Sequence, residues 1–139
     1  MMFIKKPMYL AVKLSESKEW GELFAKPFML CLNVQPVSGD TDIMQYGERI
    51  SKMQKVVLPM YVWLSEIKRH ISLIKRDYPQ YIKESYDCLF KEGDRAYLDR
   101  LVPKEEPAED GTYLCTDCNY KVVSVREQNL AIVIYFEKI

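Results

Sequence analysis

The chain has few of the residues from which enzyme active sites are usually built. It contains a single histidine, His70, and five glycines, which form no cluster of the kind that cradles phosphate. No serine, cysteine or carboxylate stands beside His70 in a recognisable nucleophile or acid–base motif, so we interpret this histidine as a solvated or interface residue. The sequence therefore predicts neither an enzyme nor a bound cofactor.

The chain also lacks net charge and long apolar runs. Lys plus Arg and Asp plus Glu both number 20, so no net field attracts it to nucleic acid or to an anionic membrane. No apolar run approaches the roughly 20 residues that span a bilayer, and the N-terminal stretch lacks the order of a signal peptide. We therefore expect neither tight nonspecific DNA binding, membrane contact nor secretion.

Four cysteines are present, and Cys115 and Cys118 in "CTDC" have the spacing of half a metal site. Structural zinc usually takes four ligands from two such pairs, or from one pair and two histidines. Here only Cys31, Cys88 and His70 remain to complete a set. A thioredoxin-like pair would begin a helix, whereas a strand pattern follows Cys118. We interpret the motif as a turn with two ordinary thiols, and the pair as weak metal candidates.

Size and patterning favour one domain, residues 1–139, rich in strands. Hydrophobic residues at 48% and charged residues at 29% are typical of a globular protein, and this length can bury a core without disulfides. In the polar stretch 15–20, Ser15 or Ser17 could cap one turn of helix. Runs with strand character predict about five or six strands, at 8–14, 28–36, 52–59, 94–102, 119–127 and 130–139.

The last two runs flank Gln128 and Asn129, which predicts a C-terminal hairpin with a short loop. If the first of them alternates regularly, Tyr120, Val122 and Ser124 share one face of the strand. Lys121, Val123 and Val125 then share the other. The acidic, proline-bearing stretch 103–111 predicts a loop before this hairpin.

The middle of the chain has a helical period. Residues 60–78 predict an amphipathic helix, which Pro79 ends, and residues 80–90 predict a shorter one. The fold class that follows is mainly β with an inserted helix (α+β), built as a small β-barrel or sandwich. The apolar positions of the helix are Leu64, Ile67, Ile71, Ile74 and Tyr78.

Two segments carry motifs that resemble a known family. Residues 32–59 read as a strand, a Pro-x-Ser-Gly-Asp turn, a Tyr-Gly pair and a strand ending in valines. The matching residues are Pro36, Ser38, Gly39, Asp40, Tyr46, Gly47, Val56 and Val57. Residues 90–99 and 119–139 form the second segment, in which a Gly-Asp pair opens a strand and a Tyr-x-Val-x-x-Val strand pairs with the last one. The matching residues there are Gly93, Asp94, Tyr120, Val122 and Val125.

Both segments are similar to the head-tail connector proteins in the necks of tailed bacteriophages, of the head-closure or stopper type. The resemblance implies a β-barrel or sandwich that assembles as a ring of six or twelve copies. It implies a structural virion protein that seals packaged DNA in the head and offers the tail a docking surface. The implied partners are portal and adaptor proteins above, tail-terminator and tail proteins below, and DNA passing through the channel. Assembly would occur in the bacterial cytoplasm.

The chain departs from the family pattern at residues 60–89, where a helical insertion replaces a shorter connection. Its cationic residues are candidates for contact with the channel or a neighbouring subunit, and the acidic loop 103–111 could complement segment 68–76 across subunits. Two alternatives remain: another neck ring protein, either tail terminator or adaptor, and a small zinc- or nucleic-acid-binding module. The candidate contact residues are Lys68, Arg69, His70, Lys75 and Arg76.

Overall fold

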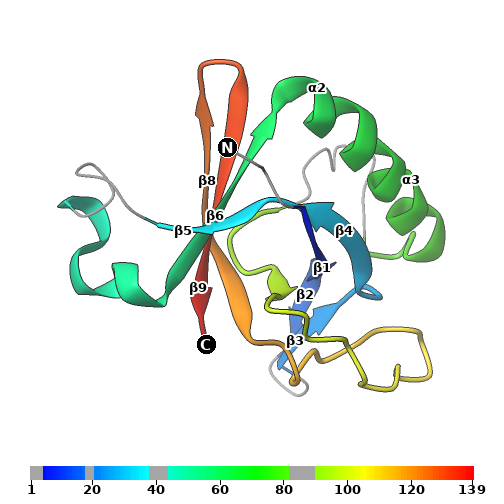
Figure 1. Ribbon diagram of the computed structural model, residues 1–139. Helices are drawn as coiled ribbons and strands as arrows, with labels where there is room; N and C mark the ends of the chain where they lie inside the picture. The colour runs from blue at the N-terminus through cyan, green and yellow to red at the C-terminus, as the bar shows by residue number, and fades with distance from the viewer. Residues whose placement is uncertain (1–4, 18–20, 38–43, 82–89) are drawn as a thin grey trace.

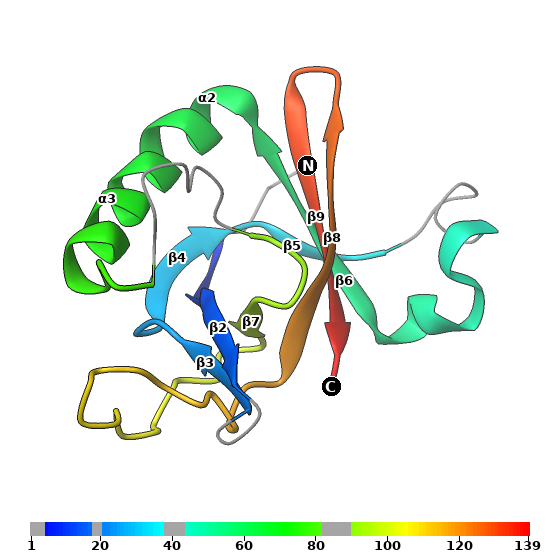
Figure 2. The same cartoon turned by 180° about the vertical axis from the view of Figure 1, so that it is seen from behind.

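The computed structural model describes residues 5–17, 21–37, 44–81 and 90–139, and these form a mainly β fold with a longer helical segment at 60–77 and a shorter one at 44–52 (Figures 1 and 2). Seven strands make a curled antiparallel sheet in the order β4-β1-β7-β8-β9-β6-β5, and β2 pairs with β3 separately. The predicted fold class, mainly β with an inserted helix, is confirmed. The strands are β1 Lys6–Ala11, β2 Lys13–Ser17, β3 Gly21–Phe24, β4 Phe28–Leu32, β5 Val34–Pro36, β6 Met53–Pro59, β7 Arg95–Tyr97, β8 Tyr120–Gln128 and β9 Ala131–Lys138.

The two edge strands of the large sheet explain why it curls. β4 pairs with β1 at one edge and β5 pairs with β6 at the other, yet only Asn33 separates β4 from β5 in the sequence. One residue spans only about 3.5 Å, so the two edges must come together. The sheet is therefore bent toward a barrel, with its apolar residues enclosed.

The interior of the curled sheet holds the main core. On β9, alternate residues Ile132, Ile134 and Phe136 face this interior, where Phe90 is also completely buried. Each large apolar side chain that is fully buried stabilises the fold by roughly 1.5–3 kcal/mol. Val133 and Tyr135 point the other way and are buried in a second cluster, so β9 is covered on both faces.

The predicted helix at 60–78 is confirmed and closes one side of the core (Figure 1). It comprises α2 (Met60–Val62), one π-helical turn (η2, Trp63–Ile67) and α3 (Lys68–Asp77). Its buried residues Ile67, Ile71 and Ile74 fall at the helical spacing seen in the sequence. Pro79 cannot continue the helix, and Tyr78 leaves helical geometry with φ −130° and ψ 56°.

The C-terminal hairpin is confirmed, with Asn129 and Leu130 in its turn. Asn129 adopts φ +54°, a conformation that asparagine tolerates better than most residues. The alternation predicted for β8 is wrong after Val122. A register shift between Val122 and Ser124 opposes Val122 to Phe136 but Ser124 to Tyr135, because a bulge inserts one extra residue. Ser124 therefore faces outward.

The bulge also returns Val125 to the interior core, on the side of Tyr120 and Val122. The extra residue, Val123, packs with the outer cluster instead. The prediction that Val123 and Val125 share one face is therefore wrong. A single inserted residue moves every later side chain of the strand to the opposite face.

Other local expectations need correction. Ser15 and Ser17 lie in β2 and not in a helical turn, since β2 and β3 form a hairpin. The predicted strand 94–102 ends at Tyr97, because Asp99 and Arg100 adopt φ +57° and +65°. The run 28–36 divides at Asn33, so the described chain has more strands than the five or six expected. Most of the second predicted helix falls on residues 82–89, outside the described part of the chain.

Candidate interaction surfaces

The motif pair Tyr46–Gly47 lies in an arm, residues 44–52, which folds over the outer face of β8 and β9 (Figure 1). The hydroxyls of Tyr46 and Ser124 are hydrogen bonded at 2.7 Å, and the Tyr46 ring lies 5.3 Å from that of Tyr135. Gly47 has φ +57° and begins the short helix η1 (Gly47–Lys52). Pro36 pairs with Gln54 at the base of the arm, whereas Gly39 and Asp40 lie outside the described residues.

Two arginines hold the arm against the sheet. Arg49 forms a bidentate ion pair with Glu137, in which Nε donates to Oε2 at 2.5 Å and Nη2 donates to Oε1 at 3.1 Å. The hydrogen bond from Arg49 lowers the pKa of Glu137. The guanidinium of Arg126 lies 5.1 Å from the ring centre of Tyr135 and 5.7 Å from that of Tyr46, within cation–π range.

The same face carries an excess of positive charge, and we call it the basic outer face. Strand register opposes Lys121 to Glu137 and Arg126 to Val133, and on β6 it opposes Lys55 to Tyr135. Among the described residues of the arm, β6, β8 and β9, the carboxylates are Glu48 on the arm, Glu127 near the tip of the hairpin, and Glu137 itself. Sequence reasoning missed this surface because three separate segments supply its cations. The basic outer face comprises Arg49, Lys52, Lys55, Lys121 and Arg126.

The motif pair Gly93–Asp94 connects separate segments of the barrel by hydrogen bonds. Asp94 has no exposed surface, and its carboxylate accepts hydrogen bonds from the backbone N–H groups of Lys13 (2.9 Å) and Lys91 (3.0 Å). The Lys91 ammonium lies 2.8 Å away, yet burial is the largest effect and raises the Asp94 pKa. Gly93 adopts φ +99° and donates its N–H to the Val122 carbonyl, so the pair ties β2 and β7 to β8.

The remaining motif residues of the second segment belong to the core. Tyr120 and Val122 are buried, and Val125 packs against them. The Tyr120 hydroxyl accepts a hydrogen bond of 2.9 Å from Gln54 Nε2, which keeps this polar group satisfied inside the fold. These side chains support the barrel and are not available to a partner.

The cationic helix residues are less available than the sequence suggests. Arg69 lies 3.9 Å from Glu66, and Arg76 lies 3.1 Å from Asp77. His70 stacks on Phe28 with ring centres 4.3 Å apart, and burial lowers its pKa, aided by Arg69. Its ring is therefore neutral at pH 7 and serves packing. Of the other candidates, Lys68 is exposed and Lys75 is half-buried.

The end of the helix lies beside the acidic loop 103–111 in the same chain. The Tyr78 hydroxyl donates to the Gly111 carbonyl at 2.8 Å and accepts the Lys26 N–H at 2.8 Å. Tyr81 donates to Asp110 Oδ2 at 3.2 Å. The loop is irregular, as predicted. Because this adjacency puts both charged segments on one side of the molecule, they are poorly placed to meet head to tail across subunits.

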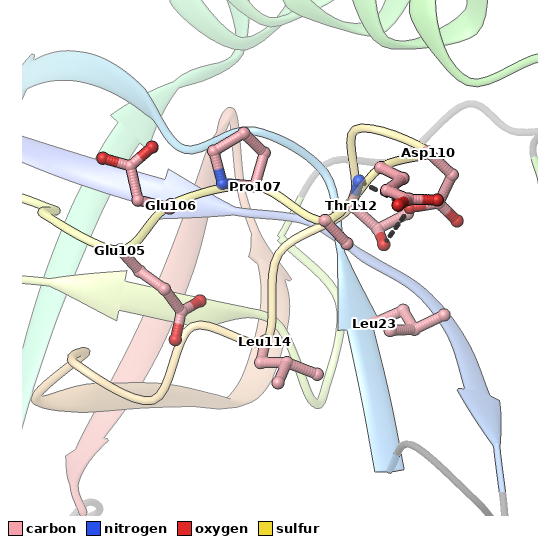
Figure 3. A pocket seen from close by; sticks show the side chains of 9 residues that line it. Leu23, Glu105, Glu106, Pro107, Asp110, Thr112 and Leu114 are labelled. Carbon is pink, nitrogen blue, oxygen red and sulfur yellow. Dashed lines mark hydrogen bonds between the residues drawn. The ribbon is translucent and has the colours of Figure 1, made fainter.

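The acidic loop borders a hollow of about 610 Å³ that we call the acidic hollow (Figure 3). The carboxylate of Glu105 accepts hydrogen bonds from the backbone N–H groups of Cys115 and Thr116, which follow the loop. Glu106 points away from Glu105 in Figure 3 and is exposed, as is Glu109. The hollow is lined by Leu23, Glu105, Glu106, Pro107, Ala108, Glu109, Asp110, Thr112 and Leu114.

Cys115 and Cys118 lie in the turn that leads into β8. Cys115 is buried with φ +52°, and burial raises the pKa of its thiol to about 12. Burial also raises the pKa of Cys118, whose N–H donates to the Cys115 carbonyl at 3.4 Å. Both thiols are therefore protonated at neutral pH. In the described part of the chain, no group of three or more His, Cys, Asp or Glu residues is placed to hold a metal ion.

Comparison of the chain with protein-family models, curated proteins and solved structures finds no match. Among the described residues, no helix has both the length and the apolar character needed to cross a bilayer.

Proposed function

We propose that this protein is a ring-forming connector of the head-closure type in the neck of a tailed bacteriophage. The observation that carries the proposal is the contact between the two motif-bearing segments. Tyr46 of the first segment bonds to Ser124 of the second, and within the second segment Gly93 and Asp94 are hydrogen bonded to Val122. Motifs that are distant in the sequence thus support one structural unit, the strands β8, β9 and β6 with the arm.

The architecture suits a mechanical role. A cyclic ring requires two different contact patches per subunit, and the curled sheet presents its arm and its acidic loop at separate places (Figure 1). A channel through which DNA passes should not bind phosphate strongly, because every neutralised phosphate adds affinity, and the chain has no net charge. Portal or adaptor proteins above and tail proteins below are the partners that this role implies.

The alternatives suit the fold less well. An adaptor would be mostly helical, whereas this chain is mostly strand. A module that binds single strands would expose aromatic rings on a basic face, but Tyr46 and Tyr135 are buried beneath Arg126. A tail terminator is the remaining neck candidate, since it also forms a ring.

Deletion of the gene from the virus tests the proposal, with electron microscopy of the particles and an assay of DNA in the heads. We expect heads that lose their DNA beside free, finished tails, and restoration of joined virions by the wild-type gene in trans. Tails of abnormal length beside DNA-filled heads would instead support the tail terminator. Normal joined virions would overturn both.

A further inference from the structure

The two charged surfaces lie on opposite sides of the molecule. The arm and the outer face of β8 and β9 lie on one side of the barrel, and the loop that borders the acidic hollow lies on the other (Figures 1 and 2). Both views agree on this separation. The basic outer face and the acidic hollow are therefore presented in different directions.

The positive side has charge that its own carboxylates do not neutralise. Arg49 binds Glu137 directly, and the charges of Lys121 and Lys52 also lower the pKa of this carboxylate, so three cations share one carboxylate. Arg126 directs its guanidinium toward the Tyr46 hydroxyl at 3.5 Å and the two tyrosine rings. Among the described residues, Glu48 and Glu137 do not balance the four cations Arg49, Lys52, Lys121 and Arg126, so this face keeps a positive excess.

The acidic hollow has the charge that complements the basic outer face. In the part of the chain that the structure describes, neither Glu106 nor Glu109 lies within ion-pair distance of a cation. Apolar surface lies close to both patches: Leu114 in the hollow is 46% exposed, and Met44 on the arm is 87% exposed. A contact between the two sides would bury apolar area as well as pair charges.

We infer that the basic outer face of one copy docks into the acidic hollow of the next copy. This inference rests on the proposed ring and names its subunit contact. Because the patches differ and lie on opposite sides, each copy can use both at once, and the contact repeats from copy to copy until the ring closes. Duplex DNA is the rival occupant of the basic face, but it would leave the matching acidic hollow without a role.

Two charge-reversal variants test the contact by sedimentation velocity and native mass spectrometry. Lys52→Glu with Lys121→Glu reverses the basic face, and Glu106→Lys with Glu109→Lys reverses the hollow. Each variant alone opposes like charges, so we expect the dissociation constant of the contact to rise about tenfold or more. An equimolar mixture restores opposite charges at both contacts, and we expect it to assemble with the two variants in equal numbers.

The matched control is Lys5→Glu with Lys6→Glu, which changes the net charge equally but lies at the exposed start of β1, and we expect it to assemble as the wild type does. Wild type that stays monomeric, reversed variants that assemble normally, or a mixture that fails to assemble would each overturn the inference. So would loss of binding to a labelled duplex DNA in the basic-face variant with assembly unchanged. None of these outcomes would alter the gene-deletion phenotype, which tests the neck role separately.

Discussion

The carboxylate of Asp94 accepts a hydrogen bond of 2.9 Å from the backbone N–H of Lys13, which lies 81 residues earlier in the chain. Asp94 is completely buried and is also paired with Lys91. One side chain thus connects the first half of the barrel to the strand that precedes the C-terminal hairpin. The Gly-Asp pair in the sequence is explained by this structural connection.

Replacing Asp94 with Asn should destabilise the protein by about 3 kcal/mol, because it removes the partner of a buried, charge-assisted network. Urea unfolding monitored by circular dichroism measures the change. The control is Glu92→Gln, which removes an exposed carboxylate two residues away and should cost less than about 0.5 kcal/mol. Equal effects from the two variants would contradict a structural role for Asp94.

Ile71→Ala should destabilise the protein by about 2–5 kcal/mol, because it leaves a cavity between the helix and the sheet. Leu73, two residues later, is 40% exposed, and Leu73→Ala should have a much smaller effect. Thermal and urea unfolding of the two variants would compare them. If both changes were mild, the helical insertion could not be an integral part of the core.

The pairing of Arg49 with Glu137 should make stability depend on pH in the acid range. The folded-state pKa of Glu137 lies below its ordinary value of 4.5, so its contribution is fully present above that value. The contribution is lost as the pH falls through the lowered pKa. Glu137→Gln should therefore be less stable than wild type at pH 7, and the difference should shrink toward pH 2. A difference that stayed constant with pH would exclude this ion pair as its source.

Cys115 should react slowly with thiol reagents in the native protein, since its thiol is buried and its pKa is raised to about 12. Cys31 is exposed and should react fast. Labelling followed by peptide mass spectrometry distinguishes the two, and unfolding in urea should abolish the difference. Rapid native labelling of Cys115 would contradict its burial.

Protein purified without chelator should contain much less than one equivalent of zinc per chain. The described residues bring no third and fourth ligand to Cys115 and Cys118. Elemental analysis by mass spectrometry measures the metal, with Cys115→Ser as the control. One equivalent that disappears in that variant would restore the metal interpretation.

The sequence by itself determined the elements whose signals are local. Ile67, Ile71 and Ile74 recur at helical spacing and Pro79 stops the run, so the helix was predictable. The alternation in the last strand and the positive φ tolerated by Asn129 likewise predicted the C-terminal hairpin. The loop at 103–111 followed from its charge and prolines.

Only the tertiary structure decided which side chains come together. The bulge at Val122 and Ser124 has no sequence signal, yet it turns Ser124 toward Tyr46 and gives the arm its anchor. The basic outer face could not be read from the sequence either, because Lys52 and Lys121 are far apart along the chain. Local periodicity specifies where an element forms, but the pairing of strands, which depends on long-range burial, specifies which charges share a surface.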